Sequence, residues 1–270
     1  MALRCVYTDL DGTLLGLGGA LLRDAEGDFS LRQVRALEAC YRAGAEVVIM
    51  SGRREPQVMS DARLIGQTSY IYEAGCAVMI DGERTLLTGE WVPDEEGTPA
   101  DKMLTAGIPQ LLFDRFPGRL EWHNPWHVDR RLSHLFRGKV DVGAANAALA
   151  EHGHEDLRFL DNGVIGRRME GIDFVHAYHL VPGGASKAKA VAFHMRARGF
   201  APAECVAIGD SVEDLDAAGA VGRFFVVANG PEHDSEMREA IGAYANVTIT
   251  EGSMGDGFYE AVVSTLAASR

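Results

Sequence analysis

The sequence is poor in the features that mark several large classes of protein. Its four cysteines, Cys5, Cys40, Cys76 and Cys205, are far apart and show no paired spacing of the kind that binds metals. We expect them to be buried free thiols. No apolar run approaches the roughly 18 residues needed to cross a bilayer, and the first residues show no signal-peptide pattern. We therefore expect a cytoplasmic protein without a membrane partner.

Positive charge is also scarce. The 270 residues include 26 Lys and Arg against 39 Asp and Glu, a formal net charge of −13. Because nucleic-acid binding needs a basic footprint, we expect no nucleic-acid partner. A small anionic ligand remains compatible with this charge, since local cations and a metal can reverse the field within one cleft. The composition carries no signal for an oligomeric state.

What the sequence does contain is a repeated alternation of strand-like and helix-like segments. Short apolar runs at Cys5–Thr8, Glu46–Met50 and 205–208 are each followed by a loop or a helical pattern. Residues 31–43 predict a helix, with Ser30 as its N-cap and Gly44 at its end. Further strands are predicted at Tyr70–Tyr72, Ala77–Ile80 and 224–227. This order of elements predicts a Rossmann-like α/β core with a parallel sheet.

The middle of the chain breaks this rhythm. Residues 82–182 contain all three tryptophans and six of the nine prolines. Here we predict helices at 98–116 and 142–152, and strands at Leu120–Trp122, 133–137 and 172–180. The earlier rhythm resumes at residue 183. We therefore predict a catalytic core formed by 1–81 and 183–270, with an α/β cap domain inserted at 82–182.

Polar residues follow three of the predicted core strands. These residues are Asp9, Ser51 and Asp210. In a parallel sheet, ligands bind beyond the carboxyl ends of the strands, so neighbouring strands would bring the three side chains together. Asp9 and Asp11 are spaced so that one carboxylate can attack phosphorus while the other exchanges a proton with the leaving group. The alternative is that this segment is only a turn after a strand.

A second acidic pair lies near the other end of the core. Asp210 follows a strand, and Asp214 is expected one turn into the next helix. Carboxylates at this place supply the hard oxygen ligands that Mg²⁺ prefers. Acidic residues at a helix start are equally common as simple caps.

Other residues could neutralise or bind a phosphate. Lys187, at a predicted helix start, could balance the charge of a transferring phosphoryl group. A surface lysine is the alternative reading for this residue. The remaining candidates offer hydroxyl groups, amides or positive charge to phosphate oxygens: Thr13, Ser51, Gly52 and Arg53.

Four motifs follow one another along the chain: the first aspartate pair, Ser51, Lys187 and the second aspartate pair. In this order they resemble the motifs of the haloacid dehalogenase-like superfamily, and the inserted segment is similar to the large α/β cap of its Cof-type branch. The resemblance implies that Asp9 is the nucleophile and Asp11 the general acid/base. It implies that Ser51 binds phosphate and that Lys187 balances charge. It further implies an Mg²⁺ site with these ligands: Asp9, the main-chain carbonyl of Asp11, and Asp210, with Asp214 in support.

Two positions depart from the pattern of that branch. Glu213 stands where an asparagine is common in the last motif, and Ala74 stands where an Asn-Gly pair is common after the third strand. Both changes are expected to alter the metal environment or the choice of substrate.

The cap segment around Arg130 and Arg131 is locally basic within an acidic protein. One of these arginines is a candidate for binding an anionic or polyhydroxy leaving group; a solvated surface is the alternative. The sequence thus predicts an Mg²⁺-dependent phosphatase of a small phosphorylated metabolite such as a sugar, polyol or glycerate phosphate. Two alternatives stay open: a sugar phosphomutase, and a non-catalytic metabolite-binding protein on the same fold.

Overall fold

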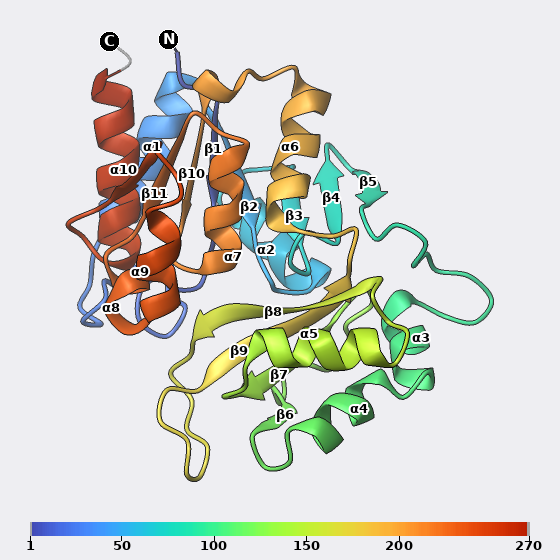
Figure 1. The fold of residues 1–270 in the computed structure, drawn as a ribbon. Helices are drawn as coiled ribbons and strands as arrows, with labels where there is room; N and C mark the ends of the chain where they lie inside the picture. Colours follow the sequence, from blue (N-terminus) through green and yellow to red (C-terminus); the bar gives the residue numbers. More distant parts are fainter. Residues whose placement is uncertain (1, 269–270) are drawn as a thin grey trace.

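The structure, a computed structural model, describes residues 2–268 and contains two sheets (Figure 1). The larger sheet has eight strands, in the spatial order β12-β11-β10-β1-β2-β3-β4-β5. Their bounds, in that order, are Val247–Ile249, Arg223–Val226, Cys205–Gly209, Cys5–Thr8, Glu46–Met50, Tyr70–Tyr72, Ala77–Ile80 and Glu83–Leu86. Strands β12 to β3 are parallel, whereas β4 and β5 are antiparallel additions at one edge.

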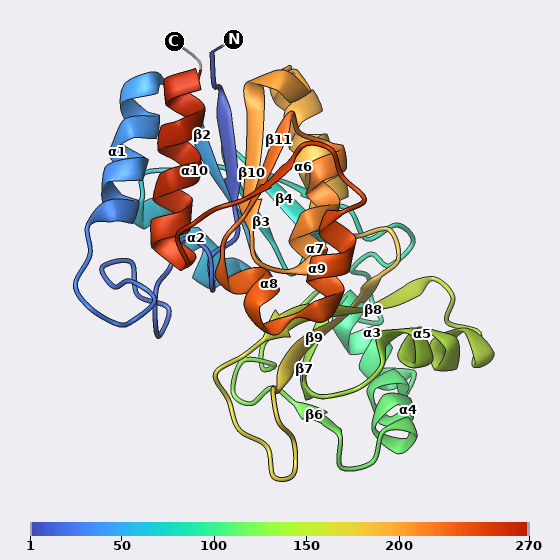
Figure 2. The same cartoon turned by 60° about the vertical axis from the view of Figure 1, so that its left-hand side comes forward.

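Helices cover both faces of the larger sheet because its strands are apolar on both sides. In β1, Val6 packs into the cluster that contains helices α1 (Arg32–Ala43) and α10 (Met254–Ala268). The next residue, Tyr7, packs on the opposite face with α6 (Lys187–Arg198). Figure 2 shows α1 and α10 side by side on one face, with α6 on the other.

The remaining helices of this part are short. Their bounds are α2 Glu55–Leu64, α7 Val212–Leu215, α8 Asn229–His233 and α9 Ser235–Ile241, with 3₁₀ turns at Pro202–Glu204 and Asp216–Gly219. Among residues 2–268, no helix is both long enough and apolar enough to cross a membrane.

The smaller sheet is antiparallel, in the order β6-β7-β9-β8. Its strands are Leu120–Trp122, His134–Gly138, His176–Pro182 and Leu157–Val164, in that spatial order. Helices α3 (Pro99–Thr105), α4 (Ile108–Arg115) and α5 (Val142–Glu151) share a core with one face of it. In Figure 1 this part lies below the larger sheet, where the parallel strands end. We call it the cap.

The α/β fold class predicted from the sequence is confirmed. The domain boundaries stay a proposal, and β5 bears on the first of them, since Glu83–Leu86 pairs with β4 in the larger sheet. The cap segment therefore begins after Leu86 in our proposal, rather than at residue 82.

Local predictions were wrong in three places. Helix α1 begins at Arg32 with Leu31 as its N-cap, one residue later than expected; Ser30 Oγ still accepts a hydrogen bond from the Arg32 amide. The helix predicted at 98–116 is two helices, because Gly107 adopts a left-handed conformation (φ 74°) between them. The strand predicted to start at residue 172 starts at His176.

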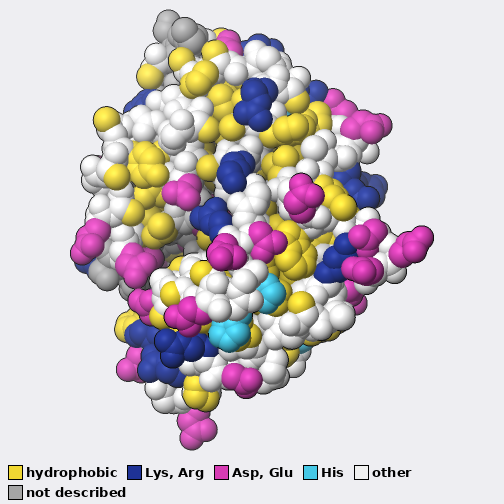
Figure 3. Space-filling view, turned by 45° about the vertical axis from the view of Figure 1, so that its right-hand side comes forward, with side chains coloured by type: hydrophobic (Ala, Val, Ile, Leu, Met, Phe, Trp, Pro, Cys, Tyr) yellow, Lys and Arg dark blue, Asp and Glu magenta, His cyan; other side chains and the backbone are white. Residues whose placement is uncertain are grey.

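Acidic, basic and hydrophobic side chains are interspersed on the face seen in Figure 3. The Asp and Glu side chains coloured on this face are spread over it and do not form a single acidic patch.

Candidate active site

Strands β10, β1 and β2 are adjacent in the larger sheet, with β1 in the middle. Asp210, Asp9 and Ser51 each follow the carboxyl end of one of these strands. The strands run parallel, with Cys5 level with both Cys205 and Glu46. The three polar residues predicted from the sequence therefore lie at one edge of the sheet.

Lys187 is the centre of the polar contacts at this edge. It is the first residue of α6, where Ser186 caps the helix by accepting the Lys189 amide. Its side chain is fully buried, and Nζ donates to Asp9 Oδ1 at 2.8 Å and to Asp214 Oδ1 at 2.7 Å. Burial lowers the pKa of Lys187, but the two carboxylates outweigh it and the net shift is upward. The lysine is thus a buried cation between two aspartates.

Asp9 is itself 6% exposed. Burial, the largest influence, raises its pKa to about 7; the Lys187 ammonium opposes this rise, and the Asp214 carboxylate adds to it. The pKa of Asp210 is also raised, chiefly by burial and then by Asp9 and Asp214. One ammonium therefore does not balance the carboxylates that converge here.

Asp210 is oriented by the loop that follows β1. The Thr13 hydroxyl donates to Asp210 Oδ1 at 2.9 Å. Gly12 has a φ of 87°, and a Cβ at this position would lie 2.3 Å from Asp210 Oδ2. Glycine is therefore required at position 12 both by the backbone conformation and by the approach of the aspartate.

Asp214 has both carboxylate oxygens engaged. Oδ1 accepts from Lys187, and Oδ2 accepts from the Ser211 hydroxyl at 2.7 Å and from the amides of Ser211 and Asp210. Ser211 and Asp214 form a capping box at the start of α7. This arrangement suits a residue that orients Lys187 and the Asp210 backbone.

Asp11 lies at the open side of the site, with its side chain 54% exposed. Arg53 donates two hydrogen bonds to its carboxylate, from Nε to Oδ2 at 2.7 Å and from Nη2 to Oδ1 at 2.6 Å. Arg53 Nη1 also donates to Asp61 at 2.8 Å. Burial lowers the pKa of Arg53, but these carboxylates raise it to a greater extent. Asp11 and Arg53 are therefore paired with each other in this state.

Ser51 is 2% exposed, and its hydroxyl accepts the Arg53 amide at 3.1 Å. Gly52 lies directly under His179 of the cap: a Cβ at position 52 would be 2.4 Å from His179 Nε2. The Ser51–Gly52–Arg53 loop is thus covered by the cap sheet.

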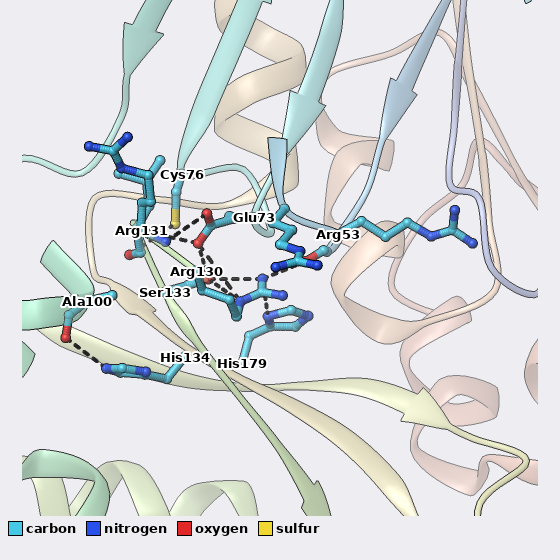
Figure 4. Close-up of polar contacts among 12 residues, drawn as sticks. Arg53, Glu73, Cys76, Ala100, Arg130, Arg131, Ser133, His134 and His179 are labelled. Carbon is cyan, nitrogen blue, oxygen red and sulfur yellow. Dashed lines mark hydrogen bonds and ion pairs between the residues drawn. The ribbon is translucent and has the colours of Figure 1, made fainter. Parts of the chain in front are cut away.

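Of the two cap arginines predicted to bind a leaving group, Arg130 reaches the core and Arg131 is exposed. Arg130 Nη2 donates to the Gly52 carbonyl at 2.6 Å (Figure 4). Their roles in binding a leaving group stay predictions.

Oxygens of Asp9, Asp210 and Asp214 all lie within 4.8 Å of one another. These are hard donors, and the upward pKa shifts of Asp9 and Asp210 reflect unbalanced negative charge. Both observations fit a small divalent cation of the Mg²⁺ type.

Two residues at the site were missed or undervalued from the sequence. Asn229 Nδ2 donates to the Gly12 carbonyl, and its Oδ1 accepts the Met254 amide, so it ties the Asp9 loop to α10. Glu213 is 6% exposed, and neither carboxylate oxygen has a hydrogen-bond partner among the described residues. Asn229 is the first residue of α8, shortly after β11 ends at Val226, and this position near a strand end was the available signal.

No protein-family model matches the chain. It is 26% identical over 268 residues to a phosphoglycolate phosphatase of Methanoculleus marisnigri, covering 96% of this chain and 95% of that protein. A phosphoglycolate phosphatase of Halorubrum lacusprofundi is 25% identical over 248 residues, with 92% of both chains covered.

Solved structures share the fold at low identity. The sucrose-phosphatase from Synechocystis, solved with sucrose and phosphate, superposes with a TM-score of 0.67 at 15% identity, over 98% of both chains. A haloacid dehalogenase-like hydrolase from B. subtilis superposes with a TM-score of 0.63 at 18% identity, over 97% of this chain and 99% of that one.

Proposed function

We propose that the chain is a member of the haloacid dehalogenase-like superfamily and an Mg²⁺-dependent phosphatase of a small phosphorylated metabolite, working through an aspartyl-phosphate. The observation that carries this proposal is the buried Asp9–Lys187–Asp214 cluster, next to Asp210 at the carboxyl edge of the sheet. A buried lysine that holds the attacking carboxylate fits phosphoryl transfer, in which positioning and charge stabilisation dominate.

The phosphate of the substrate would lie between Asp9 and the Ser51–Gly52–Arg53 loop. Lys187 holds Asp9 through Oδ1, which leaves Oδ2 as the attacking oxygen. In this proposal the Ser51 hydroxyl and the Lys187 ammonium would donate to the phosphoryl oxygens. Thr13 supports this arrangement indirectly, because its hydroxyl orients Asp210.

In the first step Asp9 Oδ2 forms a bond to phosphorus while the bond from phosphorus to the ester oxygen breaks. Asp11 gives its proton to the departing alkoxide, and the alcohol leaves. In the second step Asp11 takes a proton from water as the water oxygen bonds to phosphorus. The bond from phosphorus to Asp9 then breaks, which releases inorganic phosphate and restores the carboxylate.

Asp11 must be free of Arg53 to take part in these steps. Both of its oxygens accept from Arg53 in this structure. An arriving phosphate offers the guanidinium a second anionic partner of suitable geometry. We infer that substrate binding draws Arg53 away and turns Asp11 toward the leaving group.

The metal would be held by Asp9, Asp210 and the Asp11 carbonyl, with Asp214 in support. When bound, Mg²⁺ supplies positive charge that lowers the repulsion between the carboxylate and the phosphate.

The names of the relatives make phosphoglycolate the first substrate to test, beside sugar, polyol and glycerate phosphates. Purified protein would be incubated with each compound and Mg²⁺, and phosphate release measured. We expect phosphate release from at least one monoester, and we expect EDTA to abolish this release. No release from any monoester would contradict it.

Two rivals have distinct outcomes in the same experiment. A phosphomutase would need a bisphosphate activator and would return the phosphoryl group to the sugar without net phosphate release. A non-catalytic binding protein would bind a ligand without turnover.

A further inference from the structure

The three consecutive carbonyls of the Ser51–Gly52–Arg53 loop each have a hydrogen-bond donor. Two donors come from a neighbouring turn of the core. The Ala74 amide donates to the Ser51 carbonyl at 3.1 Å, and the Glu73 amide donates to the Arg53 carbonyl at 2.9 Å. Glu73 and Ala74 have φ values of 46° and 58°. Non-glycine residues keep this left-handed conformation only where their surroundings fix it, so the turn is a rigid support.

The donor to the middle carbonyl comes from the cap. Arg130 Nη2 lies 2.6 Å from the Gly52 carbonyl, and the Arg130 side chain is only 2% exposed. Figure 4 shows the guanidinium between the loop that carries Arg53 and the cap residues Ser133 and His179. The loop is therefore fully braced only when the cap is in contact with it.

Arg130 is itself held by the turn that braces the loop. Its Nε and Nη2 donate to Ser133 Oγ at 3.2 and 3.0 Å, and Ser133 Oγ donates to Glu73 Oε2 at 2.7 Å. The Glu73 carboxylate also accepts the amides of Arg131 and Leu132. Glu73 thus serves the loop through its backbone and the cap through its side chain (Figure 4).

The same turn touches the helix that carries Lys187. A Cβ at Gly75 would lie 2.2 Å from the Ser186 carbonyl carbon and 2.6 Å from the Lys187 nitrogen. The turn at residues 73–75 therefore contacts the Ser51–Gly52–Arg53 loop, the cap and the start of α6.

His179 closes the other side of this junction. It is fully buried, its Nδ1 lies 3.5 Å from Arg130 Nη2, and its Nε2 faces Gly52. Burial, followed by the charges of Arg130 and Lys187, lowers the pKa of His179 well below its usual value. A neutral ring can pack against the loop without adding a second cation beside the arginine.

We propose that Arg130 is a positioning residue that fixes the phosphate-binding loop through the Gly52 carbonyl, so that phosphate affinity depends on contact between cap and core. This inference rests on the proposed role of the Ser51 loop in binding phosphate. It differs from the earlier hypothesis that Arg130 reads the leaving group, because here it acts on any phosphate, including one with no leaving group.

The test measures the dissociation constant of inorganic phosphate, in the presence of Mg²⁺, for the full chain and for Arg130→Ala. Loss of a hydrogen bond from a charged donor corresponds to a weakening of about 10- to 100-fold. Free guanidinium, added at low millimolar concentration, should restore part of the affinity in Arg130→Ala. The matched control is Arg119→Ala, since Arg119 is an exposed cap arginine that also donates to a backbone carbonyl, that of Lys139. This control should bind phosphate as the wild type does.

A second variant covers the case in which Arg130→Ala does not fold. Ser133→Ala removes the hydroxyl that bridges Arg130 and Glu73 but keeps their ion pair at 3.9 Å, so no buried charge is left alone, and we expect a smaller loss of affinity in the same direction. Amide hydrogen exchange of residues 51–53 should rise in both variants, because Arg130→Ala removes the third support of the loop and Ser133→Ala loosens the arginine that provides it.

Each contrary result has a defined meaning. Unchanged phosphate affinity in Arg130→Ala, with a raised KM for an organic ester, would overturn the inference in favour of leaving-group binding. A wild type that binds no phosphate would also overturn it. A wild type that binds phosphate but hydrolyses no ester would refute the proposed function alone, and the affinity comparison would still decide the role of Arg130.

Discussion

The Lys187 ammonium lies 2.8 Å from Asp9 Oδ1, and both side chains are buried, at 0% and 8% exposure. Removing one partner of such a pair leaves the other as an uncompensated buried charge, which is far costlier than the net gain from forming the pair. The attacking group and the stability of the fold are therefore linked through one contact.

Replacing Lys187 with methionine should abolish activity and destabilise the protein by about 3–5 kcal/mol. The reason is that Asp9 and Asp214 would then face each other without their shared cation. Urea unfolding with a parallel activity assay measures both effects. Lys189→Met is the control, because Lys189 is exposed two residues along the same helix and should change stability by no more than about 0.5 kcal/mol. Equal stability of the two variants would contradict the pairing.

The metal-free protein should lose stability as the pH rises from about 4 to about 7. Burial, against the opposing effect of Lys187, raises the pKa of Asp9 to about 7 in the folded state, above the unfolded value of roughly 4. The folded state then binds more protons than the unfolded state across this window, so stability is present at low pH and is lost as the pH rises. Thermal unfolding in EDTA across this range measures the slope. Asp9→Asn should flatten it, and a steeper slope in this variant would count against the assignment.

Mg²⁺ should raise the melting temperature, because it binds the folded state alone. At one hundred times its dissociation constant, the ion should add about 2.7 kcal/mol. Asp210→Asn should abolish most of this shift, since Asp210 is one of the three converging carboxylates. Asp216→Asn, an exposed position on the next turn, should retain it. An undiminished shift in the Asp210 variant would remove this residue from the metal site.

Replacing Glu213 with glutamine should stabilise the protein near pH 8 by roughly 1–3 kcal/mol, because a buried carboxylate that finds no hydrogen-bond partner in the described part of the chain would no longer have to ionise. Burial, opposed by Lys187, raises the pKa of Glu213 to about 8. The gain should therefore shrink toward pH 5, where the folded carboxyl group is already protonated. Denaturant unfolding at the two pH values measures it. A destabilised variant at pH 8 would show that the carboxylate has a partner after all.

The positions of the main side chains could be read from the sequence because strand ends in a parallel sheet share one edge. Asp9, Ser51 and Asp210 were expected together for this reason, and Lys187 was expected at a helix start beside them. The position of each residue relative to a predicted strand or helix is enough to predict that they meet at one edge, and no side-chain contact has to be known.

Contacts between distant segments could not be read in the same way. Nothing near Arg53 in the sequence indicates that it holds Asp11, and nothing near Arg130 indicates that its partner is the Gly52 carbonyl. Strand β8 was also missed, because its second half, Asp161-Asn162-Gly163, is polar and contains a register shift against β9.

The proposed mechanism requires Asp9 to attack phosphorus. The most direct measurement is a rapid-quench experiment with Mg²⁺ and the best substrate, followed by mass analysis of the peptide that contains residues 5–15. We expect a transient mass increase of one phosphoryl group on Asp9. Asp9→Asn should lack this species and lose at least roughly a thousand-fold in kcat. Undiminished turnover by a folded Asp9→Asn protein would show that Asp9 is not the nucleophile.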